Sequence, residues 1–343
     1  MSSLDSSLLD LPLSNDTKAL ITRHLWDVNN TQQQLNARNL ELRAYWSYYV
    51  EECSHALHDA GRHISARTHR NVLDIVFQLR GAVLREQLRD SLRPALLKPT
   101  PPNEDELLDS SIDLAARLLL MLDFGNLQYG FSGRSQLDWD KGTLKDFVHA
   151  YFNTPPAHTH DGVKLEKTFN GRNLGRIAGI EIVWTNNLAD HLRMTDDDTK
   201  VTVFHHASFL ELQLQNPLFP PNLINETLRT LALLFPQSDP QTRKWSPKAS
   251  ALHSLDPCLA HCGHLKTDDR QISNFTFWHD RLVILKQVFD EARPRTLAQW
   301  WCDRRNGVQW YTFWVAIVVL VLTLFFGLVQ CVEGALQVYY TMH

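Results

Sequence analysis

The segment after Pro257 gathers the side chains of this chain that are best suited to metal chemistry. Cys258, His261 and Cys262 are spaced at i, i+3 and i+4, so one helical face would present two thiols and an imidazole, and His264 follows. Thiolate and imidazole are ligands that Zn²⁺ prefers. The spacing is not that of a Cys-x-x-Cys knuckle, and no second cysteine pair accompanies it. We therefore predict no cofactor and interpret these side chains as small core or surface residues. A zinc site at this segment is the alternative interpretation.

Acid–base chemistry would need an imidazole and a carboxylate that converge in one pocket. Among the acids and histidines of the central region, His205 and Glu181 are the candidates that we favour, because both belong to segments with strand-like alternation. His206 follows His205 directly, and neighbouring strand residues point to opposite faces, so these two imidazoles should not share one ion. The chain has no Gly-x-x-x-x-Gly-Lys, Gly-x-Gly-x-x-Gly or Gly-x-Ser-x-Gly motif. The common nucleotide-binding and hydrolase classes are thus disfavoured, and the catalytic residues stay unknown.

The sequence predicts both helices and strands to position these candidate residues. Helical periodicity dominates from residue 17 to 93, where Val72, Val76, Leu79 and Val83 share one apolar stripe. Period-two alternation predicts three short strands and a weaker fourth, at 180–184, 201–204, 210–214 and 164–169. We expect an α+β fold: a mainly helical cytosolic domain with a small sheet, plus one C-terminal transmembrane helix.

Composition agrees with a folded domain and limits its partners. The chain has 343 residues, 44% of them apolar and 21% charged, with a formal net charge of −4. This apolar content suffices for a core, and the near-neutral charge gives no attraction to nucleic acid, so we expect no nucleic-acid partner. Seven arginines lie between residues 61 and 93 against three acids. Such an excess suits either the solvated face of a helix or an acidic lipid surface.

A run of 25 uncharged residues, 308–332, predicts a membrane anchor. Residues 311–332 would extend about 33 Å as a helix, enough for a hydrocarbon core of about 30 Å. Trp310, Tyr311 and Trp314 gather at one end, as aromatic side chains do at the level of lipid headgroups. We therefore expect a single-pass protein whose first partner is the lipid bilayer.

The flanking charges predict the orientation of this helix. Arg304 and Arg305 precede it, and no lysine or arginine follows them. The positive-inside bias then places the N-terminal domain in the cytosol, and the acidic start of the chain lacks the features of a signal peptide. We expect a tail-anchored protein of an endomembrane, the endoplasmic reticulum. The expected divisions of the folded part are a flexible leader (1–16), a helical region (17–100) and an α+β soluble domain (101–295). They are followed by a juxtamembrane segment (296–310), a transmembrane helix (311–332) and a lumenal tail (333–343).

Four segments resemble a set of uncharacterised fungal membrane-anchored proteins. They are LAARLLLMLDFG (114–125), VKLEKTFNGRNLGRIAGIEIVWTNNLADHLRM (163–194), KVTVFHHASFLE (200–211) and DRRNGVQWYTFWVAIVVLVLTLFFGLVQ (303–330). The resemblance implies a shared soluble module with a C-terminal transmembrane helix and a fungal source. Some of these proteins are found near secondary-metabolite genes. The resemblance implies no catalytic residues for this chain.

Three functions remain open. We favour a non-catalytic accessory or interaction module held at a membrane, with protein partners or a second copy of the chain bound to it. The first alternative is a membrane-anchored enzyme of fungal specialised metabolism with an unrecognised His/acid or zinc site. The second is a CorA-like channel. Such channels have two spans with Gly-Met-Asn after the first, whereas this chain has one predicted span, preceded by Asn306 and Gly307 in the reverse order.

Overall fold

Apolar stripes at helical spacing build the first half of the molecule. The computed structural model describes residues 3–10, 12–27, 40–96, 102–125, 136–155, 157, 162–292, 299 and 307–342. Helix α5 carries the predicted stripe, since Val72, Val76 and Leu79 are buried, and the Thr68 side chain caps its start. The described elements up to residue 152 are η1 (Ser3–Asp5), α1 (Asn15–Trp26), α3 (Arg43–Ala56), α4 (His58–Gly61), α5 (His69–Leu79), α6 (Arg85–Leu92), η2 (Arg93–Ala95), α7 (Glu104–Leu120) and α8 (Leu144–Phe152).

The described residues near the start of the chain include leucines that are packed into the core. Leu4, Leu8 and Leu13 are at most 9% exposed and belong to the main core, which differs from the flexible leader that its polar composition suggested. The Leu8 amide also donates to the carbonyl oxygen of Arg67 (3.0 Å). Three leucines spaced four and five residues apart suffice to dock this segment on the first helices.

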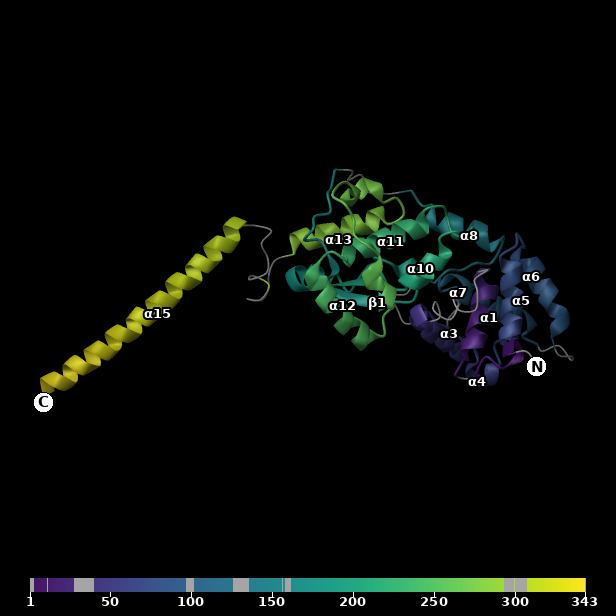
Figure 1. The fold of residues 1–343 in the computed structure, drawn as a ribbon, viewed down its shortest axis with the longest axis horizontal. Coiled ribbons are helices and arrows are strands. Elements are labelled where there is room, and N and C mark those ends of the chain that lie inside the picture. Colours follow the sequence, from purple (N-terminus) through teal and green to yellow (C-terminus); the bar gives the residue numbers. More distant parts are fainter. Residues whose placement is uncertain are drawn as a thin grey trace.

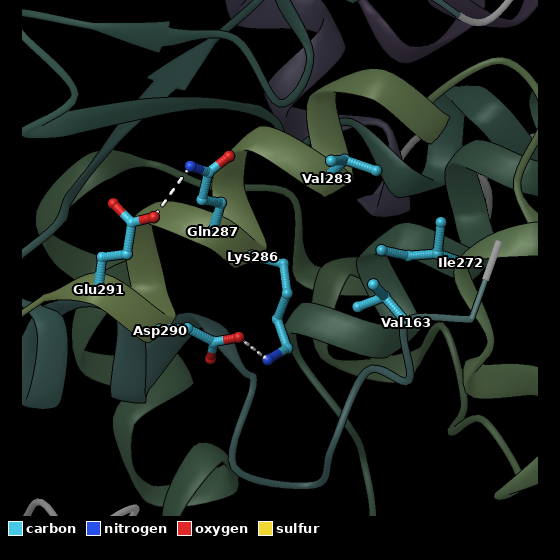
Figure 2. A pocket seen from close by; sticks show the side chains of 7 residues that line it. All are labelled: Val163, Ile272, Val283, Lys286, Gln287, Asp290 and Glu291. Atoms are coloured by element: carbon cyan, nitrogen blue, oxygen red, sulfur yellow. Dashed lines mark hydrogen bonds and ion pairs between the residues drawn. The ribbon is translucent and has the colours of Figure 1, made fainter. Parts of the chain in front are cut away.

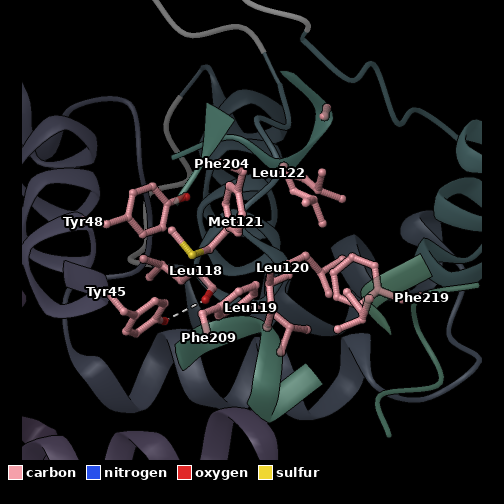
Figure 3. Close-up of a cluster of buried hydrophobic side chains, with 14 of the residues drawn as sticks. Tyr45, Tyr48, Leu118, Leu119, Leu120, Met121, Leu122, Phe204, Phe209 and Phe219 are labelled. Carbon is pink, nitrogen blue, oxygen red and sulfur yellow. Dashed lines mark hydrogen bonds between the residues drawn. The ribbon is translucent and has the colours of Figure 1, made fainter. Parts of the chain in front are cut away.

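Helix α7 is the buried centre of the fold. From Ile112 to Leu122 most side chains are inaccessible, and Leu118–Leu122 pack against aromatic rings from both halves of the chain (Figure 3). The Tyr45 hydroxyl of α3 donates to the carbonyl oxygen of Leu118 (2.7 Å). Phe204 and Phe209, from the central region, approach the same end of α7. The helical region and the α+β region therefore share one core.

Three arginines of the predicted excess pair with acids of the next helix. Arg85 pairs with Asp113 (2.6 Å) and Asp109 (3.2 Å), and Arg89 pairs with Asp109 (2.9 Å). Arg93 reaches Glu104 (3.0 Å) and Asp105 of the next helix. Helix α7 thus supplies the acids that balance α6, which leaves little of this charge for a lipid surface.

The small sheet has three strands in the order β1-β3-β2. Strands β1 (Glu181–Thr185) and β3 (Lys200–Phe204) are parallel, with Glu181 opposite Lys200 and Thr185 opposite Phe204. The two-residue β2 (Met194–Thr195) pairs antiparallel with β3. Asp196, Asp197 and Asp198 turn the chain between them with φ values of 53°, 50° and 61°. Aspartate tolerates this left-handed region better than most residues. Two of the predicted strands are confirmed.

Two other predicted strands are wrong. Residues 210–214 fall in and just after helix α10 (Ala207–Gln213), where Leu210 is buried but Leu214 is 48% exposed. A run of five residues cannot distinguish the two periods, and a capping carboxylate from Asp256 starts the helix here. In the segment 164–169 the only ladder contact among the described residues is an isolated bridge from Lys164 to Gln271.

The remaining described elements are helical. They are α9 (Gly171–Asn173), η3 (Leu174–Ala178), η4 (Leu188–Asp190), α11 (Leu223–Leu234), α12 (Pro240–His253), η5 (Pro257–His261), η6 (Asp268–Arg270), η7 (Ile272–Asn274), α13 (His279–Glu291) and α15 (Gly307–Met342). Helix α15 lies apart from the rest of the chain (Figure 1). Its stretch Trp310–Met342 has 33 residues and contains an 18-residue window of mean hydropathy 2.8, none of it buried, so it is long and apolar enough to cross a membrane. The α+β class with one such C-terminal helix is confirmed.

Candidate functional site

The carboxyl ends of the two parallel strands carry the most concentrated polar cluster. His205 and His206 follow the last residue of β3, and Asn186 follows the last residue of β1. The rings of the two histidines stack, with centroids 4.0 Å apart, because both lie beyond the strand and escape its alternation. His206 Nε2 donates to Asn186 Oδ1 (2.8 Å), and both histidines are at most 6% exposed. The expected opposition of these side chains is therefore not observed.

A second segment, 51 residues later in the chain, completes this polar cluster. The backbone amide of Asp256 donates to His205 Nδ1 (3.3 Å). The Asp256 carboxylate accepts from the Ser208 amide (2.9 Å) and the Ser208 hydroxyl (2.5 Å), and from the amide of Cys258 (2.8 Å). One carboxylate thereby holds the first turn of α10 against the start of η5. Sequence reasoning missed Asp256, although an aspartate just before Pro257 is a typical helix N-cap.

Burial controls the protonation of this cluster. Desolvation lowers the pKa of His205 to about 4, and it also lowers that of His206, with help from the neighbouring His205. The same cause raises the pKa of Asp256 to about 6, against the opposing hydrogen bonds from Ser208 and Cys258. At neutral pH both imidazoles are uncharged and the carboxylate is ionised. Such a set has the chemistry for proton exchange, but its hydrogen bonds are directed at backbone groups and neighbouring side chains of the fold.

The cysteine–histidine segment lies beside this cluster, and two of its side chains bond to backbone carbonyl groups of the same segment. The His261 ring bonds through Nδ1 to the carbonyl oxygen of Pro257 (3.1 Å), and the Cys262 thiol donates to the carbonyl oxygen of Cys258 (3.5 Å). His264 is exposed. Burial, reinforced by the Asp256 carboxylate, raises the pKa of both thiols to about 12. Over the described residues no group of three or more His, Cys, Asp or Glu is placed to hold a metal ion.

The two acid–base candidates do not meet. Glu181 begins β1 and is exposed, whereas His205 follows the end of β3, which runs parallel to β1. Five residues of strand separate the two ends of this sheet, about 17 Å. The structure instead pairs His205 with Asp256.

Another buried histidine, His191, lies apart from the polar cluster. His191 Nδ1 accepts from the amide of Phe204 (3.2 Å), and its Nε2 donates to the Thr230 hydroxyl (2.7 Å). Desolvation, with the nearby Arg281 guanidinium, lowers its pKa to about 3. The ring thus joins β3 to α11 as a neutral linker, a role that depends on a contact 39 residues away.

A pocket of about 390 Å³ lies elsewhere, on α13 (Figure 2). Its lining residues are Val163, Ile272, Val283, Lys286, Gln287, Asp290 and Glu291. None of the catalytic or metal candidates is among them. This hollow of ligand size is thus separate from the buried histidines.

The anchor residues lie on the first turns of α15. Trp310 and Tyr311 contact edge to face, with centroids 5.1 Å apart, and the Trp310 ring centroid lies 6.2 Å from that of Trp314. This places the aromatic group at one end of the apolar helix, as a headgroup belt requires. Arg304 and Arg305, on which the predicted orientation depends, fall outside the described residues.

Comparison with known proteins gives no match: no family model, no curated protein and no solved structure is similar to this chain. Its function must therefore be inferred from the geometry of the polar cluster, of the α13 pocket and of α15.

Proposed function

We propose that this chain is a single-pass, tail-anchored membrane protein whose folded domain works at the cytosolic surface as a non-catalytic accessory or interaction module. One observation carries the proposal: the exposed 33-residue helix Trp310–Met342. At about 1.5 Å per residue it extends about 50 Å, so it can cross a core of about 30 Å and continue into both interfaces. A helix of this hydropathy with no cover from its own chain needs lipid or another helix around it.

The proposed orientation rests on charge. Arg304 and Arg305 lie on the side of the folded domain, which supports a cytosolic domain and a lumenal C-terminal end. The endoplasmic reticulum is the membrane that we propose. The described part of α15 continues to Met342, so the proposed lumenal tail is helical.

The polar cluster supports an accessory role rather than catalysis. His205, His206 and Asp256 direct their hydrogen bonds to backbone and neighbouring side chains, which fastens the sheet to α10 and η5. Groups used in this way stabilise the folded domain. A protein partner or a second copy of the chain is the binding partner that we propose, and the kinship with fungal membrane-anchored proteins stays a prediction.

Glycosylation mapping tests this topology. The chain carries Asn-x-Ser/Thr sequons at Asn15, Asn29, Asn225 and Asn274, and a further sequon can be added on a spacer after residue 343. In microsomes we expect glycan only on the added sequon, seen as a mass shift that endoglycosidase removes. Glycan on the native sequons with none on the added one would reverse the orientation and overturn the proposal.

One observation favours an enzyme as second candidate: the gathering of Ser208, His205, Asp256 and two cysteines within one buried region. Zinc is the cofactor that such a site would take, held by Cys258 and Cys262. Metal analysis of the purified full chain decides this. Stoichiometric zinc that is lost in Cys258→Ser and Cys262→Ser would replace the accessory function with a metal-site function.

A further inference from the structure

The pocket on α13 combines an aliphatic wall with an acidic end. Val163, Ile272 and Val283 form the apolar side, and the side chains of the last helical turns of α13 form the polar side (Figure 2). Its volume of about 390 Å³ is within the range of small-molecule sites. We propose that this pocket binds a small amphipathic cation, an aliphatic chain that ends in an ammonium group.

The aliphatic wall selects the body of the ligand. Ile272 is fully buried and Val283 is 6% exposed, so both are fixed by the core behind them. Val163 comes from a separate segment of the chain, and its carbonyl oxygen accepts from the Ile272 amide (3.0 Å), which keeps the two side chains together. Val163 is the accessible member of this wall, with Ile272 and Val283 packed beside it, and the removal of an alkyl chain from water against such a wall favours binding by about 25 cal/mol per Å².

The polar end selects the charge. Lys286 pairs with Asp290, so one positive and one negative charge cancel there. Glu291 accepts a hydrogen bond from the neutral Gln287 amide, Nε2 to Oε1 at 2.9 Å, and its carboxylate adds a net negative charge. The pocket also lies over the C-terminal turns of α13, where the helix dipole favours a cation. These contributions leave the polar end with an attraction for positive charge.

An anionic ligand fits this end less well. Lys286 is the cation of the lining, and its side chain is only 7% exposed while it bonds Asp290. A carboxylate or phosphate ligand would have to displace Asp290 and then lie beside Glu291. Both steps are unfavourable, because Asp290 loses its partner and the negative charge of the ligand approaches the carboxylates of Asp290 and Glu291. An ammonium group avoids both costs.

Calorimetric titration of the full chain in phosphatidylcholine nanodiscs tests this site. Hexylammonium is the probe, and hexanoate, with the same alkyl chain and the opposite charge, is its matched control. Empty nanodiscs supply the blank. We expect saturable heat with hexylammonium and none with hexanoate. Equal binding of both probes, or no saturable heat with hexylammonium, overturns the proposal.

Two variants locate the binding in this pocket. Glu291→Lys reverses the charge at the polar end and should weaken hexylammonium about tenfold or more. Glu86→Lys makes the same change at an exposed position on α6 and should leave the affinity unchanged. Val163→Trp fills the apolar end at a half-exposed site and should abolish binding. If both pocket variants keep the wild-type unfolding temperature and the wild-type affinity, the cation does not bind here. This test does not depend on the membrane topology, so the two proposals can fail separately.

Discussion

The buried histidines are the residues that give this fold its clearest pH dependence. His191, His205 and His206 are neutral in the folded state because burial lowers the pKa of each. Below about pH 6.5 the unfolded chain takes up protons on these rings, whereas folded His205 does so only near pH 4. Stability should therefore fall as the pH decreases through this window. Asp256 opposes this loss of stability. Because its pKa is raised to about 6, the folded state binds a proton at Asp256 at a higher pH than the unfolded state does, which favours folding as the pH decreases.

Substitution of His205 measures how much this residue contributes to the pH dependence of stability. His205→Asn keeps an acceptor near the Asp256 amide and removes the titrating ring. We expect the free energy of unfolding to depend less on pH, by up to about 1.4 kcal/mol per unit between about pH 6 and about pH 4.5. Urea unfolding of the full chain, followed by tryptophan fluorescence, measures it. The exposed His264→Asn should leave the slope unchanged, and equal slopes in both variants would contradict the role given to burial.

A pair of glycines tests close packing at Asp113. Gly125 and Gly142 both have positive φ, 76° and 82°, so alanine at either costs about 1 kcal/mol in backbone strain. At Gly125 an added Cβ would also lie 2.3 Å from Asp113 Oδ2, while at Gly142 it meets no atom within 4 Å. We expect Gly125→Ala to destabilise the protein more than Gly142→Ala, by about 1–3 kcal/mol in urea unfolding. Similar losses would show that the site near Asp113 has room to relax.

At the level of elements, the arginines of α6 show how burial determines the contribution of an ion pair to the free energy of unfolding. The Arg85 side chain is 5% exposed, bonds Asp113 and lies over the Trp139 ring at 4.8 Å. Arg89 is 26% exposed. Arg85→Ala should cost about 3 kcal/mol or more, because it leaves Asp113 buried without its partner. Arg89→Ala should cost at most about 1 kcal/mol. Denaturant midpoints of the two variants measure the difference, and equal losses would contradict it.

Local periodicity predicted some elements and failed at others. The stripe of Val72, Val76 and Leu79 and the alternation in β3 correspond to real burial, and β1 pairs with β3 although its residues are half-buried or exposed. Helix α10 could not be, because its start is fixed by Asp256, which is distant in the chain. The two-residue β2 is too short to show any period. The polar cluster was found only in part for the same reason: His205 was a candidate, and its partner was not.

At the scale of the whole molecule, one shared core and one exposed helix define the architecture. The core cluster extends from Leu4 to Phe289, so residues 17–100 and 101–295 do not have separate cores. Charge and composition could not predict this, because α6 and α7 neutralise each other only once they are packed together. The apolar part of α15 could be predicted, since hydropathy and length need no tertiary contact, but the helix also covers 307–310 and 333–342, beyond the predicted bounds 311–332. Its apolar surface is the feature that best fits a membrane anchor.

Alkaline carbonate extraction of microsomes tests this anchor most directly. We predict that the full chain stays in the membrane pellet, and that Val319→Arg combined with Leu322→Arg moves it to the supernatant. Each arginine near the middle of α15 costs about 2.5–3.5 kcal/mol of insertion free energy. Glu86→Lys combined with Glu51→Lys, which changes charge only at exposed sites of the folded domain, should leave the pellet fraction unchanged. Release of the wild-type chain by carbonate, to the same extent as the arginine variant, would contradict the claim that α15 spans a bilayer.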